Sequence, residues 1–158
     1  MKSRLLHDAA GQRTYAVILE TGDEPMESLQ TFAEREEISA AQLTAIGAFS
    51  DAVLGYFEWE TKKYRRNRVS EQVEVASLIG DVALSPEGTP AVHVHVVLGR
   101  RDGSAVAGHL LEAHVRPTLE VVLTESPRYL RKVHDPESGL ALIRPDEQPR
   151  QAARVRQS

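Results

Sequence analysis

The chain has 158 residues, 41% of them apolar and 27% charged, a composition typical of one soluble globular domain. It has no cysteine, which excludes disulfides and thiolate metal sites. Its net charge of −4 argues against a protein whose entire surface binds nucleic acid. No apolar stretch approaches the roughly 20 residues of a membrane span, and the N-terminus lacks an apolar run suited to a signal peptide. We therefore expect a cytoplasmic protein with no membrane partner.

The first part of the chain predicts a strand, one clear helix and further strands. A β-type run occupies residues 14–19, and a helix is predicted over 25–37 because Pro25 suits a first helical turn. Its apolar positions follow helical spacing: Met26, Leu29, Phe32 and Ala33. From Ala41 the pattern becomes strand-like, with a turn expected at 50–51 before a second strand over 52–58.

The middle of the chain predicts a charged edge strand over 64–68 and an alternating strand over 72–84. An apolar strand follows the loop 85–90, and Asp102-Gly103 indicates a hairpin turn after it. Residues 104–109 return from that turn, while periodicity leaves 110–115 open as a short helix or a strand.

The last part predicts a strongly β-branched strand over 118–124 and then an extended tail with a short strand over 140–143. One helix among many strands indicates an α+β fold, a mixed and mostly antiparallel sheet with that helix packed on it. We expect the domain to occupy residues 1–133 and the C-terminal tail to occupy 134–158.

Three of the six histidines fall within the apolar block of residues 90–123. His93 and His95 are two apart on the predicted strand, so they project from one face, and His109 joins them if residues 108–111 pair back. Such histidines are either core or interface residues or the ligands of a divalent ion, most suitably Zn²⁺, with one coordination position left open. A metal would satisfy one nitrogen of each ring.

The remaining histidines are assigned lesser roles. His114 is either a group that supports the site or a surface residue, and His7 and His134 are expected to be exposed. Histidine ligands need acceptors for their second nitrogen, and the nearest carboxylates in sequence are Asp81, Glu112 and Glu120. Glu120 is either a strand residue facing solvent or the candidate catalytic general base, and the sequence leaves both open.

Several short segments, in this order and spacing, resemble the PPC domain, the plant and prokaryote conserved domain, over roughly residues 14–133. The matching segments are Gly47-Ala48-Phe49 with Leu54-Gly55-Tyr56, Leu78-Ile79-Gly80, Val92-His93-Val94-His95, Asp102-Gly103 with Gly108-His109-Leu110, and Thr118-Leu119-Glu120-Val121-Val122. The resemblance implies the same α+β class and a homotrimer. It also implies zinc at His93, His95 and His109, because some prokaryotic members place zinc at the corresponding histidines.

Two functions from different classes follow. The first is a regulatory or interaction module of the prokaryotic stand-alone type, with a protein partner and weak DNA association. Plant members carry Arg-Gly-Arg-Pro hooks, but this chain has no Arg-Gly-Arg. DNA contact would therefore use the basic run 62–68 or the tail, without sequence specificity.

The second function is a metal-dependent hydrolase or lyase that acts on a small molecule in a pocket between subunits. Three histidines with an open position suit that chemistry, because a metal ion can lower the pKa of bound water to about 7. A purely structural metal is compatible with the module, although structural zinc sites usually have four protein ligands.

Overall fold

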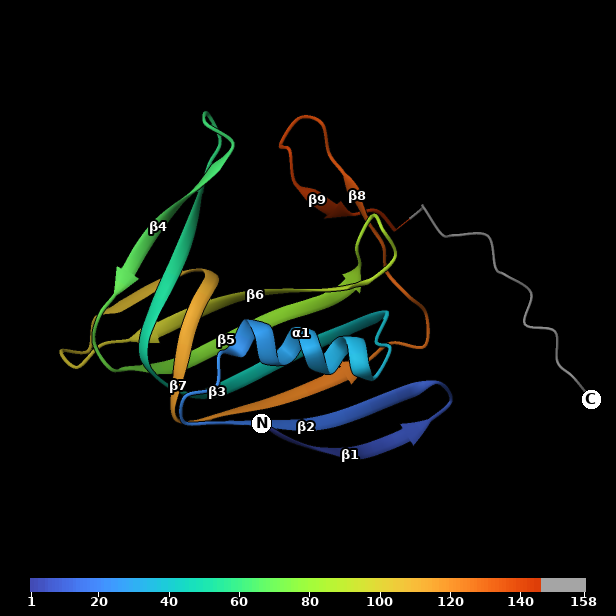
Figure 1. Cartoon of the computed structure of the whole chain (residues 1–158), viewed down its shortest axis with the longest axis horizontal. Helices are drawn as coiled ribbons and strands as arrows, with labels where there is room; N and C mark the ends of the chain where they lie inside the picture. Colours follow the sequence, from blue (N-terminus) through green and yellow to red (C-terminus); the bar gives the residue numbers. More distant parts are fainter. Residues whose placement is uncertain (146–158) are drawn as a thin grey trace, which may run out of the picture.

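The computed structural model of the chain describes residues 1–145 and contains one helix and nine strands in that part (Figure 1). The elements in chain order are β1 (Lys2–Ala9), β2 (Gln12–Glu20), α1 (Pro25–Arg35), β3 (Ala40–Glu58), β4 (Lys63–Val69), β5 (Val73–Leu84), β6 (Pro90–Gly99), β7 (Ala105–Glu125), β8 (Lys132–His134) and β9 (Ala141–Ile143). The predicted α+β class, mostly antiparallel with one packed helix, is confirmed.

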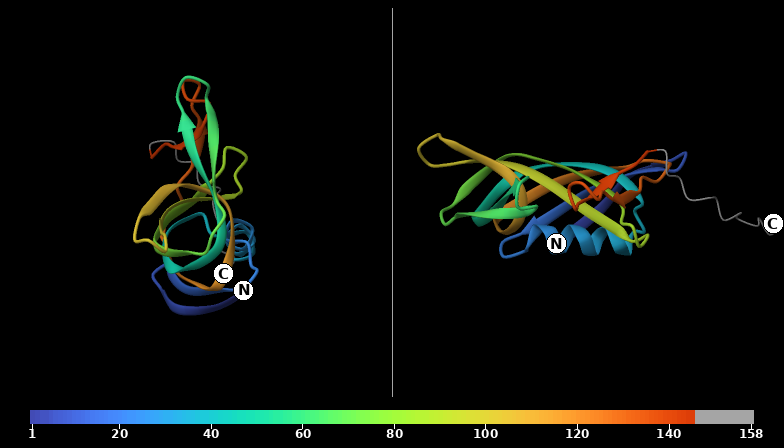
Figure 2. Two further views of the ribbon diagram at one scale, coloured as in Figure 1. Left: turned by 90° about the vertical axis from the view of Figure 1, so that its left-hand side faces the viewer. Right: turned by 90° about the horizontal axis from the view of Figure 1, so that it is seen from above.

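Four strands close into a ring. β3 pairs with β5, β5 with β6, β6 with β7, and β7 returns to β3, all antiparallel. The left view of Figure 2 looks along this barrel-like ring. β2 extends the sheet along the second half of β7, β1 pairs with β2, and β4 pairs with the second half of β3. The side chains inside the ring form the core, and they include Val94, Val96 and Leu98 of β6.

The two longest strands, β3 and β7, each pair with three other strands, which the sequence did not indicate. β3 has 19 residues and runs straight through the turn predicted at 50–51, so that prediction is wrong. The pairing of β3 with β7 shifts register between Phe49 and Asp51, which means that the turn-forming residues lie at a bulge. β7 has 21 residues, so the undecided segment 110–115 is a strand.

β1 was not predicted at all. All eight of its residues are exposed, and it pairs only with β2. A strand that buries neither face carries no apolar alternation, so the sequence has no signal by which to find it.

Helix α1 covers the gap beside the first half of β6. Glu24 caps the helix by accepting a hydrogen bond from the Glu27 amide, and Leu29, Phe32 and Ala33 are buried. The pairing of β6 with β7 begins only at His95, which leaves the edge of residues 90–94 to the helix. Gln30 accepts from the Val92 amide at 3.1 Å and donates to the Pro90 carbonyl at 2.7 Å. The helix therefore holds the strand from which two of the three histidines project.

The C-terminal segment forms a small hairpin of β8 and β9. β9 lies within the expected strand 140–143, and the expected tail residues 146–158 lie outside the described residues. Within residues 1–145, no helix has the length and apolar character needed to span a membrane.

Candidate metal centre

His93 and His95 project from the outer face of β6. Their neighbours Val94 and Val96 are buried in the ring, whereas His95 is exposed and His93 is partly buried. This alternation is what a strand with one buried face requires, and it confirms that the two imidazoles lie on the same side.

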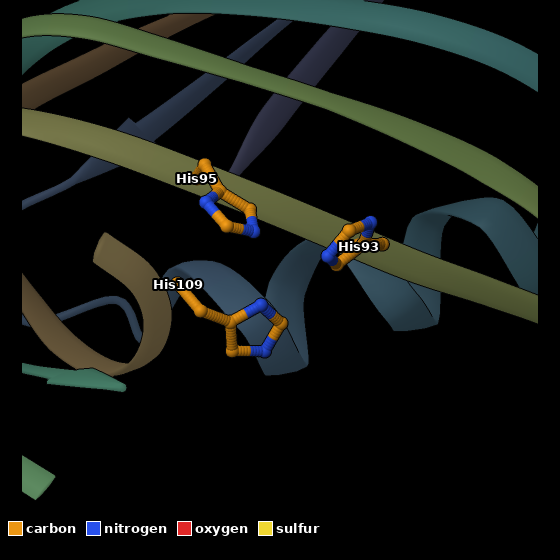
Figure 3. A group of neighbouring side chains, drawn as sticks. All are labelled: His93, His95 and His109. Carbon is orange, nitrogen blue, oxygen red and sulfur yellow. The ribbon is translucent and has the colours of Figure 1, made fainter. Parts of the chain in front are cut away.

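His109 comes from β7 and lies directly opposite His95 in the antiparallel register. The ring centroids are 5.1 Å apart for His93 and His95, 5.1 Å for His93 and His109, and 5.3 Å for His95 and His109. One ligand atom from each ring lies within 4.8 Å of the other two. Figure 3 shows a nitrogen of each ring turned toward the space that the three share.

Tyr64 of β4 closes one side of the cluster. Its ring stacks on His109 with centroids 4.9 Å apart and an interplanar angle of 27°. Gly55 of β3 pairs with His109 and makes room for this ring, because a Cβ at that position would lie 2.8 Å from Tyr64 Cδ1. No sequence pattern assigns Tyr64 to the site, since the contact depends on how the β3–β4 hairpin folds over β7.

Asp81 of β5 supports His93 from the adjacent strand. The two residues are paired in register, and the Asp81 Oδ2 atom lies 3.2 Å from Nδ1 of His93. On the other side, Lys132 Nζ lies 3.3 Å from Asp81 Oδ1. Burial alone would raise the pKa of Asp81, but the hydrogen bond with His93 and the charge of Lys132 hold that pKa below its ordinary value. The carboxylate is therefore ionised, as an acceptor for an imidazole N–H must be.

The surroundings of His95 and His109 favour the neutral form of these two imidazoles. The pKa of His109 is lowered to about 4, mainly by burial and in smaller part by the neighbouring His93, His95 and Lys132. Burial also lowers the pKa of His95, with a smaller contribution from His93, while Asp81 opposes the shift. Neutral imidazole is the form that binds a metal, so the donors are ready at neutral pH.

The donor set fits a divalent ion. Nδ1 of His109 is buried and has no hydrogen-bond partner among the described residues. A buried polar atom of this kind is costly unless something satisfies it, and imidazole nitrogens that face one space are ligands that suit a divalent ion such as zinc. A pocket of about 280 Å³ lies beside two of the three histidines, His93 and His95, and is also lined by Ile79, Gly80 and Asp81.

The other predicted residues lie elsewhere. His114 is exposed and forms an ion pair with Asp51 at 2.9 Å, so of its two predicted roles it has the surface one. Glu112 pairs with Arg66 instead of with a histidine. His7 and His134 are exposed, as predicted.

Glu120 is exposed on β7 and lines two hollows of the sheet face together with Ile46, and none of the three histidines lines either hollow. Its assignment as a general base stays a prediction. Lys132 was missed, because nothing in its local sequence relates it to Asp81, which is 51 positions earlier.

Comparison with protein families finds one match. The model of the Plants and Prokaryotes Conserved (PCC) domain matches residues 7–127. Comparison with curated proteins finds no match.

Solved structures give close likenesses over most of the chain. A plant- and prokaryote-conserved (PPC) protein from Pyrococcus horikoshii is 31% identical with a TM-score of 0.78, and the match covers 90% of this chain and 94% of that one. A metal-containing protein from Archaeoglobus fulgidus is 34% identical, with a TM-score of 0.75 and coverage of 82% and 91%. A proposed DNA-binding protein from Bacteroides thetaiotaomicron is 25% identical, with a TM-score of 0.79 and coverage of 90% and 96%.

Proposed function

Because the chain belongs to the Plants and Prokaryotes Conserved domain family, we propose that it is an interaction module that binds one divalent metal ion through His93, His95 and His109. The observation that carries this proposal is the convergence of three imidazoles around the buried Nδ1 of His109, which has no hydrogen-bond partner among residues 1–145. The likeness to the metal-containing protein from Archaeoglobus fulgidus supports it.

Zinc is the metal that this donor set suits best. Three imidazoles without a thiolate or an oxygen-rich shell favour zinc over calcium or magnesium, and they leave one tetrahedral position open. When bound, the metal would supply a Lewis acid at that position. The chain supplies the remainder: Asp81 orients His93, Tyr64 covers His109, and Ile79 borders the open side.

The metal proposal is tested by titrating Zn²⁺ into metal-free protein by isothermal titration calorimetry. We expect one site per chain in the wild type. The absence of any binding at neutral pH would overturn the proposal, because the three histidines would then lie together without binding a metal.

We further propose that the chain forms a homotrimer through the outer face of the sheet. Ile46, Ile79 and Val122 are 63%, 58% and 47% exposed, and they line one hollow of about 250 Å³ on this face. Exposed apolar side chains that gather on one face favour contact with another protein. Ile79 also borders the histidine pocket, so a second copy seated here would lie beside the open metal position.

Sedimentation velocity tests the trimer with two matched variants. Ile79→Asp introduces a charge into the apolar face and is expected to dissociate the assembly. Leu142→Asp introduces the same charge at a residue that is 40% exposed on β9, away from that hollow, and is expected to leave it intact. A wild type that sediments as a monomer at micromolar concentration would overturn the proposal.

DNA association is proposed as weak and nonspecific. The β3–β4 hairpin carries a basic cluster at its tip and along β4, made up of Lys62, Lys63, Arg65, Arg66 and Arg68. Arg66 is already paired with Glu112, and the chain as a whole has a net charge of −4. Phosphate attraction of this kind falls steeply with salt. A sequence-selective mobility shift that persists at high salt would contradict the proposal.

A metal-dependent enzyme, a hydrolase or a lyase, is the second candidate. The observation that favours it is the pocket of about 280 Å³ directly at His93 and His95, which is large enough for a small molecule beside the open position. Turnover of small esters, amides or hydroxy acids that requires metal and disappears in His95→Ala would support the enzyme. Turnover that is equal in metal-free and metal-loaded protein would exclude it.

A further inference from the structure

The C-terminal arm, residues 128–145, lies beyond the residues that the family model matches, which end at 127. It is nevertheless fastened to the sheet beside the candidate metal centre. The Leu84 amide donates to the Leu130 carbonyl at 2.8 Å, and Leu84 and Arg131 form a parallel bridge. The Arg131 guanidinium donates to the Pro86 carbonyl at 2.7 Å. The arm therefore docks on the end of β5, three residues from Asp81 (Figure 1).

One side chain of the arm reaches the centre itself. Lys132, at the start of β8, has a side chain only 10% exposed, and its Nζ atom lies 3.3 Å from Asp81 Oδ1 and 3.4 Å from the Ala91 carbonyl oxygen. The second oxygen of the same carboxylate lies 3.2 Å from Nδ1 of His93. Ammonium, carboxylate and imidazole thus form a continuous chain from the arm to a proposed ligand.

The hydrogen bond between Asp81 and His93 determines which nitrogen of the His93 ring can bind a metal. A carboxylate only accepts hydrogen bonds, so the hydrogen bond with Asp81 requires a proton on Nδ1 of His93, and a metal would bind the His93 ring through its other nitrogen. The lone pair is then on Nε2, which is free to bind a metal. A nearly buried ammonium needs an anionic partner, and Lys132 therefore holds the carboxylate in the position that the imidazole requires.

We infer that Lys132 is a positioning residue of the metal centre, which acts through Asp81 to set the tautomer and orientation of His93. The inference rests on the proposed metal function and adds to it a dependence on the C-terminal arm. By linkage, metal binding must in turn favour the docked arm by the same factor.

Metal affinity, measured in competition with a coloured chelator, tests the inference. Removing an outer hydrogen-bond partner of a ligating histidine typically costs about 10- to 100-fold in affinity, and we expect Asp81→Asn to fall in this range. Lys132→Met keeps the Asp81 carboxylate but removes the ammonium that holds it in position, and is expected to cost roughly tenfold, the lower end of the same range. Lys132→Arg keeps the charge and should restore most of the affinity.

Two controls separate positioning from a general effect on the arm. Arg144→Met removes an arm residue paired with Asp135, which has no contact with Asp81, and should leave affinity unchanged. The double variant Asp81→Asn with Lys132→Met should bind no more weakly than Asp81→Asn alone, because Lys132 acts only through Asp81. If Lys132→Met does not fold, Lys132→Gln carries the same comparison.

A second measurement needs no metal. In metal-free protein, ¹⁵N NMR of the His93 ring should report the Nδ1–H tautomer in the wild type and in Lys132→Arg, and a mixture of tautomers in Asp81→Asn. A wild type that binds no metal would overturn the proposed function. The His93 tautomer, measured in metal-free protein, would still test whether Asp81 and Lys132 position that ring. A wild type that binds metal, with Lys132→Met binding equally tightly, would overturn the inference alone.

Discussion

His109 and His114 lie five residues apart on the same strand, yet they differ in burial, in hydrogen-bond partners and in the direction of their pKa shifts. The imidazole of His114 is exposed and paired with Asp51, whose hydrogen bond and charge raise its pKa. The imidazole of His109 is partly buried, with a pKa lowered to about 4 and an Nδ1 atom that has no partner among residues 1–145. His114 has its partner on the neighbouring strand, whereas a buried nitrogen of His109 is left without a partner in the part of the chain that the structure describes.

The same contrast separates the carboxylates. Asp81 lies between Lys132 and His93 and takes part in the site. Glu120 lies on the exposed sheet face beside Ile46 and lines hollows that contain no histidine. The position of Glu120 in a family-like motif was therefore a weak indication that it belongs to the site. The pairing of Asp81 with the strand that carries His93 was a stronger one.

The largest expected effect comes from removing the proposed ligands. His93→Ala, His95→Ala and His109→Ala should each lower zinc affinity about a hundredfold or more, because each removes one of only three protein donors. His114→Ala should leave affinity unchanged. Calorimetric titration of the four metal-free variants measures this contrast, and tight binding by His109→Ala would break it.

A smaller loss is expected when the ring that stacks on His109 is removed. Aromatic pairs contribute about 0.5–1.5 kcal/mol, so Tyr64→Leu should weaken zinc binding by roughly three- to tenfold. Tyr56→Leu is the matched control, because Tyr56 is exposed on the same hairpin, outside the ring contacts of the histidine cluster. Equal affinity of the two variants would mean that the stacking does not support the ligand.

The two histidines of β7 should also give opposite pH dependence to the stability of metal-free protein. The pKa of His109 is lowered on folding, so its contribution is intact above its ordinary pKa of 6.5 and is lost as pH falls toward about 4. The pKa of His114 is raised on folding, so its contribution is present below pH 6.5 and is lost as pH rises through the folded-state value.

Urea unfolding between pH 4 and pH 8 measures these contributions. Replacing His109 with Asn should flatten the loss of unfolding free energy on acidification. Replacing His114 with Asn should make that loss slightly steeper, since its surface ion pair is worth little. Identical pH profiles for the two variants would contradict the contrast.

The smallest effect concerns the surface pair alone. Asp51→Asn should lower the pKa of His114 toward its ordinary value, because it removes the charge that favours imidazolium. NMR titration of the His114 ring measures this shift, and the metal affinity of the same variant should be unchanged. A pKa that stays raised would point to a different partner for His114.

The sequence predicted the parts of the site that depend on local pattern. Strand alternation put His93 and His95 on one face, and the Asp102-Gly103 turn returned the chain so that His109 lies opposite His95. Asp81 was among the three candidate carboxylates because it is near in sequence, and the register of β5 against β6 placed it beside His93.

What the sequence could not predict depends on contacts between distant elements. The contact between Tyr64 and His109 depends on the long strand β3 continuing through a bulge at Ser50 and Asp51. The sequence predicted a turn at these two residues instead. Lys132 reaches Asp81 from the short strand β8, at the end of the expected domain 1–133, where the sequence predicted no strand. Neither contact leaves a periodic signal in the local sequence.

The central claim is that the unsatisfied imidazoles of the outer sheet face hold a metal ion. Elemental analysis of protein purified without a histidine tag, beside a His93→Ala control, tests it most directly. We predict about one zinc ion per chain in the wild type and none in the control. Absence of zinc and of any other divalent metal from both samples, or an equal amount in both, would contradict the claim and leave the histidines as interface residues.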